Sequence, residues 1–355
     1  MGDSTCEGGT VVEDVRCGLC GNAQASVVCS QRDLLHRVSD EEFTIVRCQR
    51  CGLLYLNPRP TKDEIGKYYP VQYFGAPSPP RPFSRVKRWL MEDFYGYPSS
   101  EPNGIRRKLR KLTLWPEMLR RSLGGRGLLP WVGRGRLLDV GCGHGVNAAM
   151  LAQQGWQVSG LDLGPEIVKQ AQTLLGDRVQ VGDLLTVRYP DLSFDVVLMS
   201  HSLEHMYELF RVLEEARRIL DDQGLLVIVV PNAGGLEAKL FGRWWVNWDP
   251  PRHLYHFNTT TLTRLLEQAG FSLVRVRTGV TPVHFVSSLE RVWMHWLHCR
   301  LPAKRLIEKF VARPFCLVAG NLGYGTELIV YAIKRTGLAS TVSGTYAEVG
   351  VPSFH

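Results

Sequence analysis

Short apolar segments alternate with amphipathic segments through the second half of the chain. By their period, the apolar segments predict strands and the amphipathic segments predict helices. The predicted strands are residues 136–140, 157–162, 179–181, 194–200, 225–230, 271–277 and 327–334. The predicted helices are residues 146–154, 165–175, 209–220 and 260–269. Alternation at this spacing predicts an α/β fold built on a doubly wound, mostly parallel Rossmann-like sheet.

The same pattern divides the 355 residues into four parts. These are a small cysteine-containing module at 1–60, a helical, basic linker region at 61–130, the α/β domain at 131–336 and a tail at 337–355. Within the α/β domain, residues from about 279 to 327 include a Trp-rich stretch and predict a helical insertion. A length of this order agrees with about two folded units.

One apolar stripe runs through the basic linker region. Between Arg81 and Arg136 stand 14 lysines and arginines but four acids, a surplus larger than the +8 of the whole chain. The stripe recurs at helical spacing and consists of Ile105, Leu109, Leu112, Trp115 and Leu119. Two interpretations stay open. The helix either packs on the α/β domain with a solvated basic face, or residues 81–136 bind an anionic membrane surface or a phosphate-bearing substrate.

The sequence has no stretch of about 18 apolar residues, which argues against a spanning helix. Its first residues lack the apolar core of a secretory signal. We therefore expect a cytoplasmic protein, and any membrane attachment would be peripheral, at the inner face of the membrane.

Two Cys-x-x-Cys pairs stand in the N-terminal module. Each pair places two thiolates on one turn of the chain, and the pairs are Cys17 with Cys20 and Cys48 with Cys51. Two such turns can together form a tetrahedral zinc site. Four free thiols are the alternative. A redox pair is disfavoured, because it needs a single pair beside a βαβ unit. Four protein ligands leave no open position, so the sequence predicts a structural zinc in a zinc-ribbon-like module.

A glycine loop joins the first predicted strand to the first helix of the α/β domain. Asp139, Gly141 and Gly143 lie in the phrase LDVGCGHG, where glycines let the backbone approach a ligand. Asp162 ends the next strand, 21 residues after Gly141, where a carboxylate can accept both ribose hydroxyls. Asp183 follows the third strand, where an acid can meet an adenine amine.

The phrases LDVGCGHG, LDL, GDL and FDVVLMSHSLEH resemble the motif series of class I S-adenosylmethionine-dependent methyltransferases, over roughly residues 131–278. The resemblance implies S-adenosylmethionine as cofactor. Its methionine portion would lie at Asp139, Gly141 and Gly143, its ribose at Asp162 and its adenine at Asp183. Leu163, Leu184 and Ser200 complete the predicted cofactor-binding set. The G-x-G-x-G spacing after Asp139 favours this cofactor over a nicotinamide dinucleotide.

The cysteine module, the NPRP phrase, the aromatic run from Tyr68 to Phe74 and the phrase DPPRHLYHF also resemble bacterial zinc-containing methyltransferases. Relatives of that kind act on sugars and other small cell-surface or secondary metabolites. The resemblance therefore implies a small-molecule acceptor, such as a sugar, a nucleotide-sugar or a glycan or lipid precursor.

The residues after strand four set the acceptor chemistry. Enzymes that methylate nucleobase amines have the sequence Asn/Asp-Pro-Pro-aromatic at this position. This sequence instead has Ser200-His201-Ser202-Leu203-Glu204-His205. The difference favours an oxygen or carbon acceptor. The segment is similar to the Glu-x-x-Glu-His of quinone-type O-methyltransferases, which can hold a divalent ion, but His201 replaces the first Glu. The alternative is that Glu204 and His205 only cap and pack the following helix.

Histidine suits a general base because it titrates near neutrality. His253 and His256, after strand five, are the preferred candidates, and His201 and Tyr255 complete the predicted catalytic set. An RNA methyltransferase that uses the basic stretch for phosphates is the second hypothesis, with a nucleic-acid partner less favoured. A non-catalytic scaffold that keeps the fold is the third.

Overall fold

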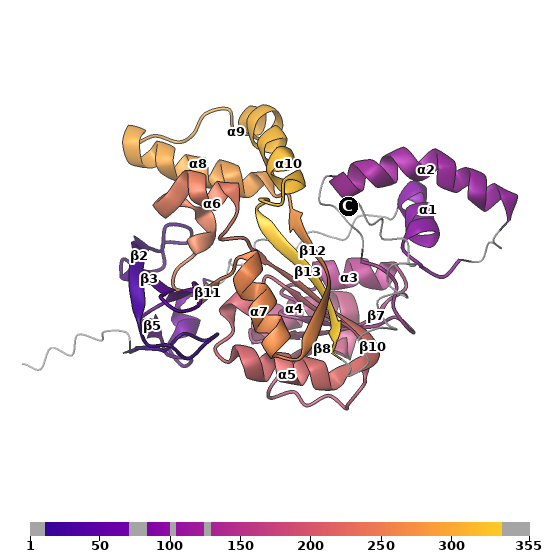
Figure 1. The fold of residues 1–355 in the computed structure, drawn as a ribbon, viewed down its shortest axis with the longest axis horizontal. Helices are drawn as coiled ribbons and strands as arrows, with labels where there is room; N and C mark the ends of the chain where they lie inside the picture. The colour runs from indigo at the N-terminus through magenta and orange to yellow at the C-terminus, as the bar shows by residue number, and fades with distance from the viewer. Residues whose placement is uncertain (1–10, 71–83, 100–103, 124–128, 336–355) are drawn as a thin grey trace, which may run out of the picture.

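The computed structural model describes residues 11–70, 84–99, 104–123 and 129–335, which form one large sheet, one small sheet and the helices around them (Figure 1). The predicted tail at 337–355, Cys6, Tyr73 and Phe74 lie outside the described residues.

The large sheet has seven strands in the order β12-β13-β10-β9-β6-β7-β8. All run parallel except β13, which is antiparallel to both of its neighbours. The strands are β6 (Arg136–Val140), β7 (Gln157–Asp162), β8 (Val179–Val181), β9 (Phe194–Ser200), β10 (Leu220–Pro231), β12 (Phe271–Gly279) and β13 (Glu327–Lys334). This arrangement confirms the predicted mostly parallel, doubly wound sheet.

Helices cover both faces of this sheet. Apolar residues of α3 (Val146–Gln153) and α4 (Pro165–Leu175) pack on the face that includes Leu137. Those of α5 (Leu209–Ile219) and α7 (Thr259–Gln268) pack on the face that includes Leu138. Successive strand residues point to opposite faces, so a strand covered on both sides must be apolar throughout. That requirement explains the continuous apolar run of β10.

The small sheet contains a strand that the sequence analysis did not place there. Its order is β11-β4-β3-β2, and a separate pair joins β1 to β5. Five of these strands come from the N-terminal module: β1 (Val12–Glu13), β2 (Ala25–Arg32), β3 (Glu42–Cys48), β4 (Leu54–Leu56) and β5 (Arg59–Pro60). The sixth, β11 (Tyr255–His256), comes from the α/β domain and pairs with β4. The module and the domain therefore share a sheet.

A buried arginine also joins the module to the domain. Arg252 is fully buried, and its guanidinium donates to Asp33 at 2.6 and 3.0 Å and to Asp249 at 2.6 and 3.1 Å. It also donates to the carbonyl of Tyr68 at 2.8 Å. Asp33 accepts in addition from the amides of His36 and Val38. Two carboxylates and a carbonyl thus compensate the desolvation of one cation.

The remaining helices lie outside the large sheet. They are α1 (Arg85–Phe94), α2 (Ile105–Leu123), α6 (Leu236–Phe241), α8 (Pro282–Leu297), α9 (Lys304–Ile307) and α10 (Arg313–Asn321). Short helical turns span Ile65–Tyr68, Gly176–Arg178, Leu203–His205, Gly242–Trp244, Val246–Trp248 and Glu308–Ala312. Helices α8, α9 and α10 form the region predicted as a helical insertion. In the part of the chain that is described, no helix is long and apolar enough to cross a membrane.

The expectation that the apolar stripe of the basic helix packs on the α/β domain is wrong. Helices α1 and α2 project from the body of the molecule (Figure 1), and Ile105, Leu109, Leu112 and Trp115 are exposed on α2. The inner side of α2 is held by ion pairs, because Arg107 and Arg110 both bind the buried carboxylate of Asp93.

We predict that Asp33→Ala lowers the free energy of unfolding by about 3–5 kcal/mol, because it leaves a buried cation partly unpaired. Burial opposes ionisation of Asp33, but the hydrogen bonds from Arg252 and two amides lower its pKa. Its stabilisation is therefore present above the unfolded-state pKa, about 4, and is lost as the pH falls below it. Urea unfolding of Asp33→Ala between pH 7 and pH 3 should show a shallower loss of stability than the wild type. Equal acid dependence would contradict the assignment.

Candidate active site

The glycine loop between β6 and α3 forms a backbone cradle beside the end of β9. Gly141, Gly143 and Gly145 have φ of 77°, 53° and 73°, in the left-handed region that favours glycine. A Cβ atom on Gly141 would stand 2.7 Å from Cβ of Ser202. The absence of side chains at these positions therefore lets the loop pack closely against its surroundings, and at Gly141 it abuts the segment that follows β9.

Two carboxylates lie at the carboxyl ends of the neighbouring strands β6 and β7. Asp162 accepts from the amide of Gly143 at 2.9 Å and from that of Gly164 at 3.1 Å, so it braces the cradle. A carboxylate has about four lone-pair positions, which leaves acceptors for two hydroxyls. Burial, and then the charge of Asp162, raise the pKa of Asp139 to about 7. Ser200, half-buried at the end of β9, borders the same edge.

The structure places the predicted adenine residues at the turn after β8. Asp183 accepts from the amides of Leu185 and Thr186 and forms a 2.9 Å ion pair with Lys62, which lies just after the N-terminal module. Leu184 is buried, whereas Leu163 is exposed next to Asp162 and offers an apolar surface at the site. Lys62 is exposed, and its ammonium occupies one carboxylate oxygen of Asp183. The cradle and these acids fit S-adenosylmethionine.

His201 carries a positive charge between two carboxylates. Its Nδ1 lies 3.5 Å from Glu204, and its Nε2 lies 3.3 Å from Glu327. Burial lowers the pKa of His201, but contacts with Glu204 and Glu327 outweigh burial and raise it to about 10. The residue also has a φ of 53°, so this turn holds a non-glycine residue in the left-handed region. A cation at this position can pair with anions but does not accept a proton.

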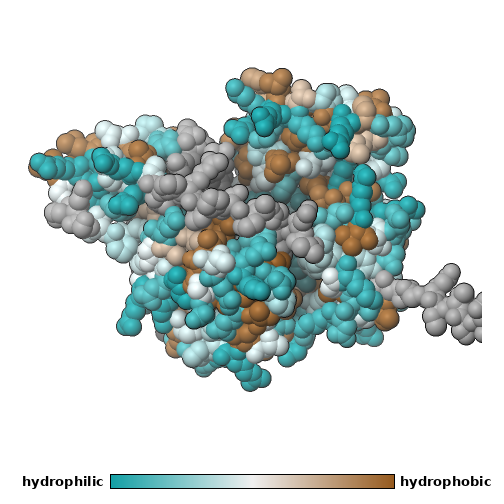
Figure 2. All heavy atoms as spheres, turned by 180° about the vertical axis from the view of Figure 1, so that it is seen from behind, coloured by the Kyte–Doolittle hydropathy of each residue, from teal (hydrophilic) through white to brown (hydrophobic). Residues whose placement is uncertain are grey.

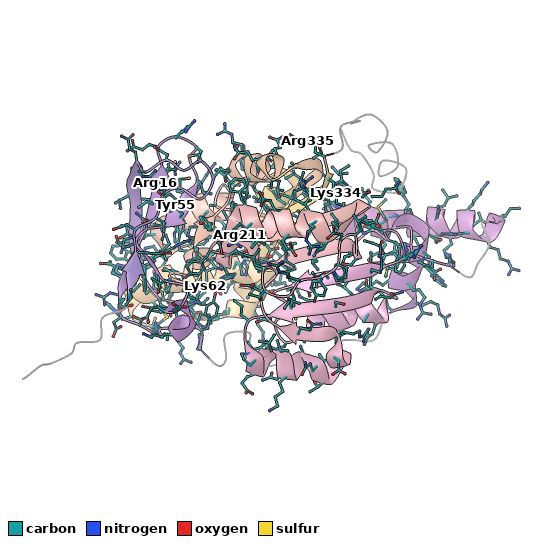
Figure 3. The ribbon with its side chains drawn as sticks, turned by 90° about the horizontal axis from the view of Figure 1, so that it is seen from below. Arg16, Tyr55, Lys62, Arg211, Lys334 and Arg335 are labelled. Carbon is teal, nitrogen blue, oxygen red and sulfur yellow. The ribbon has the colours of Figure 1, made fainter. Side chains whose placement is uncertain are left out.

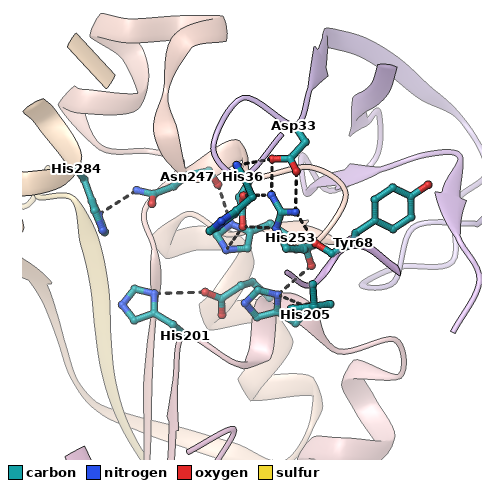
Figure 4. Close-up of polar contacts among 12 residues, drawn as sticks. Asp33, His36, Tyr68, His201, His205, Asn247, His253 and His284 are labelled. Carbon is teal, nitrogen blue, oxygen red and sulfur yellow. Dashed lines mark hydrogen bonds and ion pairs between the residues drawn. The ribbon is translucent and has the colours of Figure 1, made fainter. Parts of the chain in front are cut away.

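Glu204, His205 and His253 converge beside His201 (Figure 4), with one ligand atom of each within 4.8 Å of the others. Nδ1 of His205 lies 2.9 Å from the carbonyl of Arg252, and Nδ1 of His253 lies 2.8 Å from that of Asn247. A carbonyl only accepts, so both Nδ1 atoms carry the proton and both Nε2 atoms keep a lone pair. Such a cluster can take up a proton or ligate a divalent cation.

The environment keeps His205 neutral. Burial, and then the neighbouring His253, lower the pKa of His205 to about 4. Tyr69 places its hydroxyl 3.1 Å from Nδ1 of His205. The two residues stand 136 positions apart, so no local sequence signal reveals this contact.

Two predicted catalytic residues lie in the small sheet instead of in an open pocket. Tyr255 is buried, and its hydroxyl accepts from Arg59 at 3.3 Å and contacts Gly18 between Cys17 and Cys20. His256 is buried against the ring of Trp248, and among the described residues neither of its ring nitrogens has a hydrogen-bond partner. Pairing of β11 with β4 places both residues at the join with the module.

The four paired cysteines form one cluster in the N-terminal module. Sγ of Cys17 lies 3.4 Å from Sγ of Cys51, and Sγ of Cys20 lies 3.5 Å from that of Cys48. Sulfurs bound tetrahedrally to one zinc at about 2.3 Å stand about 3.8 Å apart, so the spacing is close to that of a zinc site. Tyr55 lies in the same module (Figure 3), where burial and the nearby thiols raise its pKa to about 12.

A cleft of about 620 Å³ lies between the small sheet and α6. Arg47, Lys239 and Arg243 line it together with Trp248, so its charge is mostly positive. Its volume is within the range of small-molecule sites. The cleft does not include the glycine loop, and Trp248 separates it from His256.

The fold and the glycine cradle are those expected of a class I methyltransferase domain. The model of a methyltransferase domain family matches residues 107–276. This match confirms the predicted class of the domain.

Curated relatives agree with the class. The chain is 31% identical over 194 residues to 27-O-demethylrifamycin SV methyltransferase of Amycolatopsis mediterranei, covering 51% of this chain and 64% of that protein. It is 30% identical to a probable S-adenosylmethionine-dependent methyltransferase of Mycolicibacterium smegmatis, covering 39% and 52%. It is 36% identical over 101 residues to ajmaline N-methyltransferase of Rauvolfia serpentina, covering 26% and 35%. The alignments thus span between about a third and two thirds of these relatives.

We predict that Gly141→Ala lowers the free energy of unfolding by about 1–3 kcal/mol and weakens S-adenosylmethionine binding, because its Cβ strains the backbone and displaces Ser202. Gly176→Ala is the matched control, since Gly176 has a φ of 63° with nothing near its Cβ. Calorimetric titration should show weaker binding for the first variant alone. Equal affinities in the two variants would rule out this role for the cradle.

Proposed function

We propose that the protein transfers a methyl group from S-adenosylmethionine to an oxygen or carbon of a small molecule, such as a sugar, a nucleotide-sugar or a glycan or lipid precursor. One observation carries the proposal. The cradle that suits the methyl donor abuts Ser202. Glu204 and His205 follow Ser202 in the next turn of the chain, and His253 lies beside them. Donor and proton acceptor are thereby adjacent.

The reaction assigns separate roles to the carboxylates and the histidines. Asp139 and Asp162 hold the donor at the ends of β6 and β7. The methyl carbon leaves the sulfonium sulfur as its bond to the acceptor forms, and the acceptor loses a proton. Nε2 of His253, or of its neighbour His205, takes that proton, since each keeps a lone pair while Nδ1 donates to a carbonyl. The products are S-adenosylhomocysteine and the methylated acceptor.

The other predicted bases support this role less well. His201 is already protonated at neutral pH because Glu204 and Glu327 flank it. The hydroxyl of Tyr255 is directed toward Arg59 and the cysteine module. His256 is enclosed behind Trp248, and among the described residues no group forms a hydrogen bond with its ring nitrogens to orient them. We therefore assign proton transfer to the pair formed by His205 and His253.

Two observations favour a small-molecule acceptor. The relatives named above include an enzyme for a demethylrifamycin and one for ajmaline, both small molecules. The cleft beside Trp248 carries Arg47, Lys239 and Arg243, a positive lining that would attract the phosphates of a nucleotide-sugar. The segment after β9 lacks the Asn/Asp-Pro-Pro-aromatic signature of nucleobase-amine methylation, which favours an oxygen or carbon acceptor over a nucleobase amine.

We predict that His205→Ala and His253→Ala both keep S-adenosylmethionine affinity within about twofold. Whichever of the two histidines takes the proton, its alanine variant should lose about 10²- to 10⁴-fold in kcat. Acceptors would be found by incubating the protein with methyl-labelled S-adenosylmethionine and a panel of nucleotide-sugars and lipid-linked glycans. His295→Ala, on the exposed part of α8, is the matched histidine control, and Asp162→Ala, expected to lose cofactor binding, is the blank. Undiminished turnover in both cluster variants would refute the assignment of the base.

We further propose that Cys17, Cys20, Cys48 and Cys51 hold a structural zinc ion. Their sulfurs have the donor set and nearly the spacing of a tetrahedral site. Cys48 ends β3, and Leu54 begins β4 a few residues later, so a bound ion would fix β3 to β4, the strand with which β11 pairs. The metal would thereby support the segment that carries His253.

Cys48→Ser should release zinc and lower the melting temperature of the protein. Cys29→Ser is the matched control, because Cys29 lies in β2 of the same sheet but outside the cluster. Elemental analysis should find about one zinc per chain in the wild type and in Cys29→Ser. Protein purified without chelator and free of bound zinc would disprove the site.

A further inference from the structure

Helix α2 is fixed to the rest of the protein by its charged side. Arg107 and Arg110 each place Nε 2.7 Å from an oxygen of Asp93, whose side chain is fully buried. Met118, about two turns further on the same side, is buried as well. Arg107 and Arg110 therefore form ion pairs within the protein, and their guanidinium groups are mostly shielded from solvent.

The opposite side of α2 is apolar and exposed. The exposed fractions are 78% for Ile105, 57% for Leu109, 72% for Leu112 and 48% for Trp115. Residues three or four positions apart share one face of a helix, so these four side chains form a continuous strip. A surface helix normally buries such a strip against its own domain. Figure 2 shows hydrophobic and hydrophilic residues side by side on the projecting arm that carries α2.

Cations border this strip on both sides. At 100° per residue, Arg106 lies at one edge of the strip, and Lys108 and Lys111 lie at the other. All three are exposed, and Glu117 is the one acid between residues 105 and 119. An apolar strip between rows of Lys and Arg is the pattern of a helix that lies in the headgroup region of an anionic membrane.

The helical insertion contributes further exposed apolar side chains. Helix α10 contacts α2 and carries exposed Val318, and exposed Leu322 follows directly after the helix. Neither helix is long and apolar enough to span a bilayer, so shallow insertion is the mode of membrane binding that these helices can support. The position of α2 on an arm that projects from the body of the molecule keeps its apolar strip away from the glycine cradle (Figure 1).

We propose that the outward face of α2 attaches this protein to the surface of a membrane rich in anionic phospholipids. Ile105, Leu109, Leu112 and Trp115 insert among the headgroups and upper acyl chains, while Arg106, Lys108 and Lys111 pair with lipid phosphates. The proposal does not depend on the methyl-transfer reaction. If both hold, attachment would bring the active site to acceptors that are themselves embedded in lipid.

Flotation of the full chain with vesicles tests this proposal. The vesicles are pure phosphatidylcholine, or phosphatidylcholine with about a third phosphatidylglycerol. The protein should float with the anionic vesicles alone, and raising the salt from 0.05 to 0.5 M should weaken binding because it screens the cations. Lys108→Glu with Lys111→Glu should reduce the partition coefficient by at least about fivefold for each cation removed.

Leu109→Asp with Leu112→Asp removes the apolar strip and should abolish flotation. Leu240→Asp is the matched control, since Leu240 is equally exposed on α6, away from this arm. Circular dichroism and S-adenosylmethionine affinity would verify that all variants stay folded, which also separates failure of this proposal from failure of the proposed function. Three results would each overturn the proposal. The strip variants could float as the wild type does, the protein could bind neutral vesicles equally well, or light scattering could show a dimer that the strip variants dissociate. Salt-sensitive retention of RNA without vesicle binding would point to nucleic acid instead.

Discussion

The buried guanidinium of Arg252 is the interaction on which the arrangement of this protein depends. It reaches Asp33 in the N-terminal module, Asp249 in the α/β domain and the carbonyl of Tyr68 between them. Its own carbonyl accepts from His205, and the next residue is His253. A cation removed from water needs partners on several sides. The contacts that compensate Arg252 therefore fix the positions of the module, of the segment around Tyr68, and of His205 and His253 relative to one another.

The histidines beside Arg252 differ in protonation because their surroundings differ. His201 lies between Glu204 and Glu327 and stays charged, whereas His205 and His253 donate to backbone carbonyls. Burial disfavours the charged form of a histidine, and at His201 the carboxylates facing both of its ring nitrogens reverse that preference. Next to it, Nε2 of His205 and of His253 each keep a lone pair, because Nδ1 donates to a carbonyl.

The cysteine module and the catalytic domain are not independent units. The domain contributes β11 to the module's sheet, and the segment just after the module brings Lys62 to the turn after β8 and Tyr69 to His205. Each contact joins residues far apart in sequence, so loss of the module and this segment would disturb the surroundings of His205 as well as the local fold. This coupling gives a physical reason for the α/β domain to carry the small module.

The sequence by itself determined the local elements and the donor side of the site. Apolar periodicity defined each strand of the large sheet, and the glycine spacing around Asp139 defined the cradle, because both depend on neighbouring residues. Only the tertiary structure decided the acceptor side. The pairing of β11 with β4 turned Tyr255 toward the cysteines, and Asp93 drew Arg107 and Arg110 inward so that the apolar strip of α2 faces outward. These outcomes follow from buried charges whose partners lie far away in the chain, which a local pattern cannot report.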